Sequence, residues 1–305
     1  MLVNLEGVFG DARDNPAIED PIVVLRHGIF GADSSLAALT SEIESHLPNA
    51  TVDNRSYNWR LAVLQNGAEL ADHILQELDP DRPLILIGHS MGGLVCRVAN
   101  VILSDGAKFD SLLPWLLPQL GYQDLIPRLQ NKFSKKTNRK VNGLITLATP
   151  NSGAFLQGQV SGLCALLHVG VSAFASFQDP SIIDLTHDRL FRFLQQFSVS
   201  TPTLSISGSA SSRFSALSGQ ATRKLASWTL KGWAGGLNLS QPNDWVVEDV
   251  SVNLTSSILP NEIVHHGRSL YMHLRAYEDC TSVTHINIYD RTSVRNHMFS
   301  FIARC

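Results

Sequence analysis

Residues 83–103 read PLILIGHSMGGLVCRVANVIL, and they carry the clearest structural pattern of the chain. Its first five residues form an apolar run typical of a buried strand, and residues 94–103 have the apolar pattern of a helix. Between them lies GHSMG, in which Gly88 and Gly92 flank Ser90. A sharp strand-to-helix turn strains the backbone of its central residue, so the neighbouring residues must be small. The pattern therefore predicts a turn that presents the Ser90 hydroxyl at a helix N-terminus, where the helix dipole favours negative charge.

Strand and helix patterns alternate through the rest of the chain, as in a mainly parallel sheet with helices on both faces. Apolar runs predict strands at residues 21–26, 51–59, 83–87, 141–147, 203–207 and 270–277. Apolar residues spaced three and four apart predict helices at residues 34–47, 61–78, 94–103, 181–197 and 291–303. The hydrophobic content of 44% is enough for one large core. We therefore expect a single α/β domain over residues 1–305.

Two segments do not fit this alternation. Residues 104–140 carry a leucine-rich stretch between prolines, and residues 154–177 contain no charged side chain. Long connections in compact domains are usually functional or independently structured, so we expect residues 104–140 and 154–180 to form a cap or lid. Packed insertions away from the site are the alternative. The uncharged segment exceeds the roughly 20 residues that span a bilayer, but its glutamines, serines and histidine favour a flap over a membrane anchor.

A serine hydroxyl is a poor nucleophile unless a base removes its proton, and the base needs a carboxylate to orient it. After a turn of this kind the acid and then the base follow in sequence, each after a later strand. His285 lies between the last predicted strand and the final helix, where the base is expected, whereas the other histidines are less well placed. Asp244 lies between the last two predicted strands, and the apolar residues after it would bury its carboxylate. Asp249 is the alternative acid.

Acyl transfer also needs hydrogen-bond donors for an oxyanion, each worth about 2.7–4 kcal/mol where measured. The backbone N–H of Met91, which follows the serine, is expected to be one donor. The other is expected in HGIFG, residues 27–31, where two glycines let the backbone approach the reacting carbonyl. Ile29 is the preferred donor there and Phe30 the alternative. His27 is expected to anchor this loop through hydrogen bonds.

At this point the sequence resembles a known family. The blocks that carry the resemblance are, in chain order, HGIFG, GHSMGG, LATPNSG, PNDWVV and VTHINIY. They resemble the lipase and carboxylesterase branch of the α/β-hydrolase superfamily, in particular bacterial lipase-like hydrolases and the lipase-like domain of GPI inositol-deacylases. The resemblance implies an α/β-hydrolase fold with an inserted cap and a catalytic triad of Ser90, Asp244 and His285. It also implies that Ile29 and Met91 donate to the oxyanion.

We expect three residues to contact the substrate: Phe30, Asn151 and Trp245. The loop that contains Asn151 matches the strand-end loop that borders the acyl pocket in the family, where histidine is common instead. Trp245 stands where the family often has glycine after the acid. An indole at that position is expected to narrow the pocket or to shield the carboxylate.

These features predict a serine carboxylic-ester hydrolase that works through an acyl-enzyme. The apolar cap segments favour lipid or fatty-acyl esters as substrates. A thioesterase or a phospholipase fits the same triad, because the triad does not distinguish leaving groups. A non-catalytic binding module that kept the fold is an alternative of another class.

Composition bears on partners and location. The net charge of -3, without a basic stripe, argues against a nucleic-acid partner. Four widely spaced cysteines form no metal-ligand pattern, and the expected mechanism needs no metal or organic cofactor. Residues 1–14 lack the basic start and apolar run of a secretory signal, which predicts a cytoplasmic protein; export with a Cys164–Cys280 disulfide is the alternative. Peripheral contact with a lipid interface stays open, and the sequence does not fix the oligomeric state.

Overall fold

The computed structural model describes residues 19–29, 31–133, 139–151, 179–186, 189–197, 201–208, 264–265, 268–269, 271–276, 288–303 and 305. Its strands are β1 (Ile22–Arg26), β2 (Thr51–Asp53), β3 (Leu84–His89), β4 (Gly143–Leu147), β5 (Thr203–Gly208), β6 (Val264–His265), β7 (Arg268–Ser269) and β8 (Tyr271–Ala276). Its α-helices are α1 (Ala37–His46), α2 (Val63–Glu77), α3 (Met91–Ser104), α4 (Gly106–Gln119), α5 (Ile126–Leu129), α7 (Pro180–Thr186), α8 (Arg189–Leu194) and α11 (Thr292–Ile302). Short 3-10 turns cover Asp33–Leu36, Gln123–Leu125 and Ile288–Asp290.

One sheet organises the molecule, with the strand order β2-β1-β3-β4-β5-β8. Every neighbouring pair in it is parallel, which confirms the predicted parallel α/β sheet. Arg26 at the end of β1 lies opposite Gly88 near the end of β3. Because the strands are parallel, the loops that follow β1, β3 and β4 all leave the sheet at the same edge. The turn that contains Ser90 therefore meets the loops after β1 and β4.

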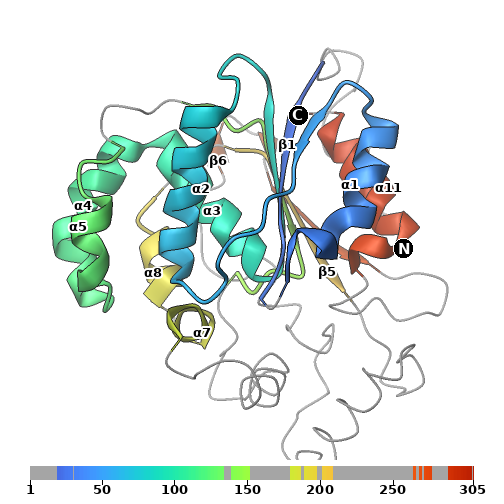
Figure 1. Cartoon of the computed structure of the whole chain (residues 1–305). Coiled ribbons are helices and arrows are strands. Elements are labelled where there is room, and N and C mark those ends of the chain that lie inside the picture. Colours follow the sequence, from blue (N-terminus) through green and yellow to red (C-terminus); the bar gives the residue numbers. More distant parts are fainter. Residues whose placement is uncertain are drawn as a thin grey trace, which may run out of the picture.

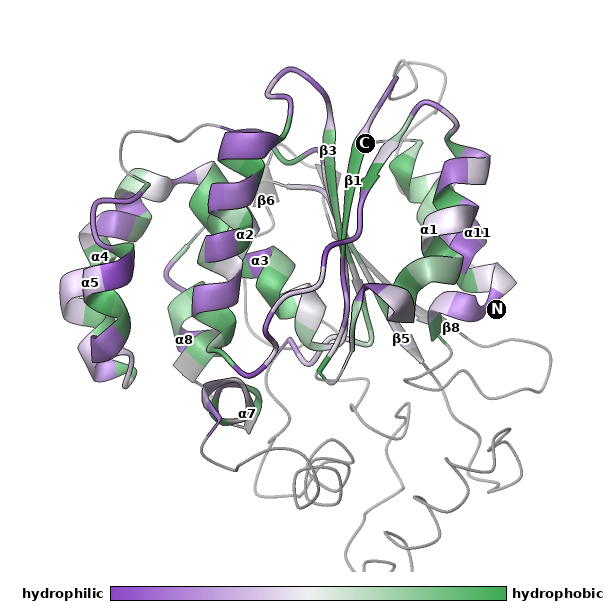
Figure 2. Cartoon of the chain, viewed as in Figure 1, coloured by the Kyte–Doolittle hydropathy of each residue, from purple (hydrophilic) through white to green (hydrophobic). Residues whose placement is uncertain are grey.

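Helices cover both faces of this sheet (Figure 1). Helices α1 and α11 lie on one face, and α2 and α3 lie on the other. Successive residues of β1 point to opposite faces of the sheet: Val23 packs on the side of α1 and α11, and Val24 packs on the side of α2 and α3. Such alternation follows from the two-residue period of a strand. Figure 2 shows the hydrophobic faces of these helices turned toward the sheet, so each face has its own hydrophobic core.

Much of the segment 104–140 is helical. Helices α4 and α5 lie outside α2 and α3 (Figure 1), and the buried side chains Phe109 and Leu113 join the same core as those helices. Trp115 faces outward and is 48% exposed. Whether this segment caps the nucleophile stays a prediction, and residues 154–178 of the second cap segment lie outside the described residues. Among the described helices, none combines the length and the apolar character needed to cross a bilayer.

Several element predictions differ from the structure in extent. The strand predicted at 51–59 ends at Asp53, because the polar residues that follow make loop contacts, such as that from the Asn54 amide to the Asp33 carbonyl. Helix α4 was not predicted, because its internal prolines suggested a loop. The helix predicted at 181–197 is divided into α7 and α8. Helix α3 begins three residues before the predicted start, directly after Ser90.

The buried carboxylate of Asp184, in α7, forms a hydrogen bond to the first turn of α2. Asp184 is 1% exposed and accepts hydrogen bonds from the Val63 backbone N–H (2.7 Å) and the Tyr122 hydroxyl (2.5 Å). Asp184→Ala leaves both donors buried without this acceptor, so we expect the free energy of unfolding to fall by about 3 kcal/mol in urea titrations. Asp124→Ala on the surface is the control and should change it by less than about 0.5 kcal/mol. Equal stability of the two variants would contradict this role.

Candidate active site

Ser90 occupies the turn between β3 and α3, as the sequence predicts. Its backbone has φ 55° and ψ -126°, a conformation that residues with a side chain rarely adopt. Hydrogen bonds hold it from both sides: the Ser90 N–H donates to the Leu147 carbonyl (2.8 Å), and the Gly93 N–H donates to the Ser90 carbonyl (3.0 Å). Strain of this kind persists only where the surroundings enforce it, and it is concentrated at functional sites.

The glycines around Ser90 are required by close backbone contacts. A Cβ on Gly88 would collide with the backbone of Gly92, and a Cβ on Gly92 would collide with the carbonyl oxygens of Arg26 and His27. A Cβ on Gly93 would collide with the side chain of Thr149. The prediction that small residues let the chain turn is confirmed for both glycines of the pentapeptide. Because Gly92 has no side chain, the start of α3 can pack directly against the end of β1.

The Ser90 side chain is enclosed, because the residue is only 2% exposed. No hydrogen bond to its Oγ comes from the described part of the chain. The residues predicted to complete the triad, Asp244 and His285, lie outside the described residues. Phe30 and Trp245, predicted at the substrate pocket, and the alternative acid Asp249 lie outside them as well.

The loop after β1 reaches the nucleophile. A Cβ on Gly28 would lie 2.8 Å from Ser90 Cβ and 3.3 Å from Ser90 Oγ, so only glycine leaves room beside the hydroxyl. Ile29 follows and is partly buried against the core that includes α2 and α3. Met91, the first residue of α3, is fully buried. The two predicted oxyanion donors therefore belong to the loop and the helix turn that flank Ser90.

His27 anchors that loop, as expected. It is fully buried, and its Nδ1 lies 2.8 Å from the Gly28 carbonyl oxygen. Its ring stacks on Tyr57, with 4.5 Å between the ring centroids and 14° between the planes. Burial lowers the pKa of His27 below its usual value, which favours the neutral imidazole. His27 makes no hydrogen bond to Ser90 Oγ, and its contact with Gly28 holds the loop.

The loop after β4 lies on the other side of Ser90. Ala148 has φ 49°, and its N–H donates to the Ile206 carbonyl (2.8 Å). Asn151 is 1% exposed, and Arg97 of α3 donates to its backbone carbonyl (3.3 Å) and its Oδ1 (3.2 Å). Sequence reasoning singled out Asn151 but missed Arg97. The signal available was a charged residue within the apolar run of α3.

The described residues include a contact between His73 and Asp53, but this pair is not placed to activate a serine. His73 Nε2 lies 2.6 Å from Asp53 Oδ2, and His73 Nδ1 lies 3.2 Å from Glu77 Oε1. Each ring nitrogen thus faces a carboxylate oxygen, so neither is directed at a hydroxyl. Arg26 and Arg55 also lie within 3.6 Å of the Asp53 carboxylate. This group of charges ties β1, β2 and α2 together.

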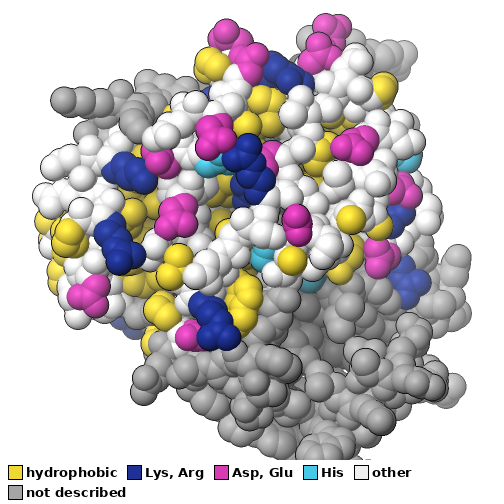
Figure 3. Space-filling model, viewed as in Figure 1, with side chains coloured by type: hydrophobic (Ala, Val, Ile, Leu, Met, Phe, Trp, Pro, Cys, Tyr) yellow, Lys and Arg dark blue, Asp and Glu magenta, His cyan; other side chains and the backbone are white. Residues whose placement is uncertain are grey.

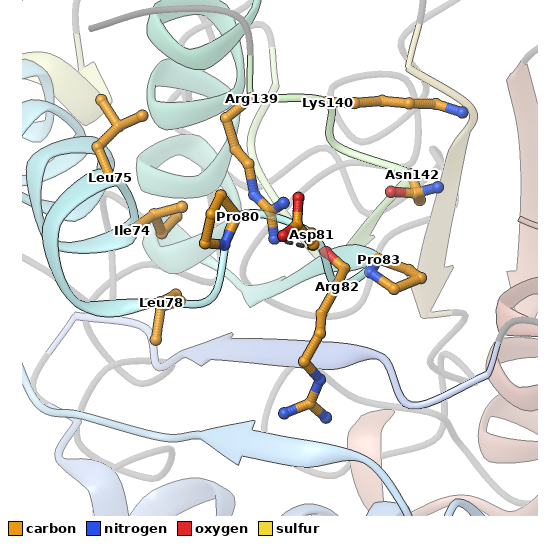
Figure 4. Close-up of a pocket in the computed structure, with 10 residues that line it drawn as sticks. All are labelled: Ile74, Leu75, Leu78, Pro80, Asp81, Arg82, Pro83, Arg139, Lys140 and Asn142. Carbon is orange, nitrogen blue, oxygen red and sulfur yellow. Dashed lines mark hydrogen bonds between the residues drawn. The ribbon is translucent and has the colours of Figure 1, made fainter.

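A cavity of about 560 Å³ lies at the opposite edge of the sheet, where β3 and β4 begin (Figure 4). Its lining residues are Ile74, Leu75, Leu78, Pro80, Asp81, Arg82, Pro83, Arg139, Lys140 and Asn142. The Arg82 guanidinium donates to the Asp20 and Asn49 carbonyls, and that of Arg139 donates to the Asp79 and Arg82 carbonyls. Both arginines therefore fasten loops, and the cavity is remote from Ser90.

Surface charge and metal-ligating residues point to no further site in the described residues. On the face in Figure 3, acidic and basic side chains are interspersed rather than gathered into a basic patch. No group of three His, Cys, Asp or Glu side chains in the part of the chain described could hold a metal ion.

The parallel sheet, its helical layers and the serine turn after β3 define the α/β-hydrolase fold, and this confirms the predicted fold. The chain is similar to the lipase BlEst2 of Bacillus licheniformis in mature form, with a TM-score of 0.56, 16% identity and 95% of each chain covered. It is also similar to the propeptide form of that lipase, with a TM-score of 0.52, 17% identity, and coverage of 95% of this chain and 52% of that one. At such identities the similarity shows the fold alone. No protein-family model and no curated protein sequence matches the chain.

Proposed function

We propose that this protein is a serine hydrolase that cleaves carboxylic esters, with Ser90 as its nucleophile. The observation that carries this proposal is the strained, enclosed Ser90 at the start of α3, beside the loop after β1. If this turn only connected β3 to α3, glycine would be favoured over serine at φ 55°, because glycine adopts that conformation without strain. A nucleophile explains why a side chain is kept there.

The proposed reaction has two steps. His285 takes the proton of Ser90 while Oγ forms a bond to the ester carbonyl carbon, and Asp244 orients the imidazole and stabilises its cation. The carbonyl oxygen becomes an oxyanion that accepts hydrogen bonds from the Ile29 and Met91 N–H groups. The bond to the alcohol then breaks, and the alcohol leaves with the proton from His285. Water, deprotonated by the same imidazole, attacks the acyl-enzyme. The bond from the acyl carbon to Oγ then breaks, His285 returns the proton to Oγ, and the carboxylic acid leaves.

Two features of the site support this assignment. The N-terminal end of α3 carries the positive end of the helix dipole, which stabilises negative charge that develops at Ser90. A Cβ on Gly28 would lie 3.3 Å from Ser90 Oγ, so a glycine there lets the loop after β1 pass beside the hydroxyl. Both features support Ser90 as the nucleophile and the loop after β1 as the source of a backbone donor.

We further propose lipid or fatty-acyl esters as the substrate class. Phe30, Asn151 and Trp245 would border the acyl group, and residues 104–140 and 154–180 would cap it. The support is the apolar character of these segments in the sequence. Thioesters offer the same carbonyl to the nucleophile, so a parallel assay on an acyl thioester is needed to assign the leaving group.

A fluorophosphonate probe tests the proposal, because it phosphonylates a serine only where that serine is activated. We expect mass spectrometry of the labelled wild-type protein to place the adduct on Ser90, and we expect the same sample to hydrolyse p-nitrophenyl butyrate. Ser45→Ala, on the exposed side of α1, is the matched control and should label like the wild type. A folded wild-type protein that is not labelled, or is labelled at another serine, would refute the assignment.

A further inference from the structure

In the loop after β1, the conformationally flexible residue Gly28 lies directly beside Ser90. Gly28 must lack a side chain because Ser90 lies beside it, and glycine has little intrinsic preference among backbone conformations. The two peptide groups that flank Gly28 could therefore rotate unless other groups hold them. An amide that turned away from Ser90 could no longer donate to an oxyanion. The loop needs anchors from outside.

Both peptide groups are anchored. The His27 carbonyl accepts a hydrogen bond from the Tyr57 hydroxyl (2.7 Å). The Gly28 carbonyl accepts from His27 Nδ1 (2.8 Å) and from the Gly31 N–H (3.1 Å). The described chain has no cis peptide bond, and in a planar trans peptide the C=O and N–H point in opposite directions. Fixing the Gly28 carbonyl therefore fixes the direction of the Ile29 N–H.

Tyr57 acts on both anchors. Its hydroxyl holds the His27 carbonyl, and its ring stacks on the imidazole that holds the Gly28 carbonyl. We propose that Tyr57 is a positioning residue that holds the peptide groups on either side of Gly28 in the orientation that directs the Ile29 N–H at the oxyanion. This inference rests on the proposed function, because it gives the Ile29 N–H its purpose. Tyr57 lies in the connection between β2 and α2 and makes no hydrogen bond to Ser90 Oγ.

The protonation states agree with this arrangement. A carbonyl oxygen can only accept, so His27 Nδ1 carries the hydrogen. Nε2 is buried, and no described group hydrogen-bonds to it, which suits the unprotonated nitrogen of a neutral ring. Burial raises the pKa of the Tyr57 phenol, so it remains a donor throughout the working pH range. The two side chains thus form a neutral support for the loop.

Tyr57→Phe tests the proposal because it removes the hydroxyl and keeps the stacked ring. We expect kcat for p-nitrophenyl butyrate to fall about tenfold with KM within about twofold, since complete loss of one oxyanion donor lowers kcat by roughly 10²–10³. Inhibition by an alkyl trifluoromethyl ketone, which forms a tetrahedral oxyanion on serine, should weaken by a similar factor. Tyr57→Leu also removes the stacking and should lower kcat about a hundredfold. Titration with the fluorophosphonate normalises every rate to folded, active protein.

Thr201→Val is the matched control. Thr201 is buried just before β5, at the sheet edge opposite Ser90, and its hydroxyl donates to Asn100 (2.9 Å). This variant also loses one buried hydroxyl, but its kcat should stay within twofold of the wild type. An unchanged kcat in Tyr57→Phe, or a loss confined to KM, would overturn the positioning role while labelling at Ser90 left the proposed function standing. A wild-type protein without labelling would refute both.

Discussion

Ser90→Ala is expected to lower kcat for p-nitrophenyl esters about a millionfold, to the rate that the remaining oxyanion donors support. Without the hydroxyl no acyl-enzyme forms, and water must attack the bound ester directly. Ester hydrolysis and fluorophosphonate labelling both measure this loss. Activity within tenfold of the wild type would remove Ser90 from the reaction.

Replacing Ser90 by glycine is expected to make the protein more stable than replacing it by alanine. Ser90 has a Cβ and is held at φ 55°, which strains its backbone. Its Oγ makes no hydrogen bond to the described residues that would offset this strain. Backbone strain of this kind costs about 1–3 kcal/mol, and the greater flexibility of unfolded glycine offsets about 0.5–1 kcal/mol of any relief. We therefore expect Ser90→Gly to unfold at higher urea concentration than Ser90→Ala. The reverse order would show that the strain is smaller than this offset, which contradicts the prediction.

Gly92→Ala is expected to damage stability and activity together. The new Cβ would collide with the carbonyl oxygens of Arg26 and His27. Arg26 is the last residue of β1 paired with β3, and the Tyr57 hydroxyl holds the His27 carbonyl, so neither backbone atom can move freely. Overpacking of this kind costs about 1–3 kcal/mol or more. Moving the His27 carbonyl also displaces the loop that lies beside Ser90, and a shift of about 1 Å can lower the rate about a hundredfold. Urea titration and kcat per labelled site measure the two effects separately.

Gly143→Ala is the control for that variant. Its Cβ would lie 2.6 Å from Cys305 Sγ and 3.1 Å from side-chain atoms of Ile85 and Phe301. These are side-chain atoms at the far edge of the sheet, so they can adjust without moving the active-site backbone. We expect a loss of about 1 kcal/mol in stability and an unchanged kcat per labelled site. If Gly92→Ala behaves like Gly143→Ala, the backbone around Ser90 tolerates more movement than proposed.

The central part of the fold could be predicted because its signal is local. Strand, serine turn and helix lie within residues 83–103, and the period of the apolar residues changes there from strand to helix. The glycines on either side of Ser90 could be predicted for the same reason. Helix α4 could not, because proline argues against a helix interior, yet Pro114 and Pro118 lie on its exposed side.

Contacts between distant residues gave no signal in the sequence. Tyr57 reaches His27 across 30 positions, and Asp184 reaches Val63 across 121 positions. Nothing in the spacing of these residues indicates their pairing, since it depends on how the loops lie over the finished sheet. For Asp244 and His285 the roles in catalysis remain predictions from position and resemblance.

The two ends of the parallel sheet have separate uses. The loops that surround Ser90 follow β1, β3 and β4, whereas Arg82 and Arg139 fasten the loops at the other end. Attachment of this protein to a solid support through the arginine end would therefore leave the end that carries Ser90 open to solution. Substitutions in the loop after β4 can likewise be made while Gly28, its anchors and the strands stay untouched.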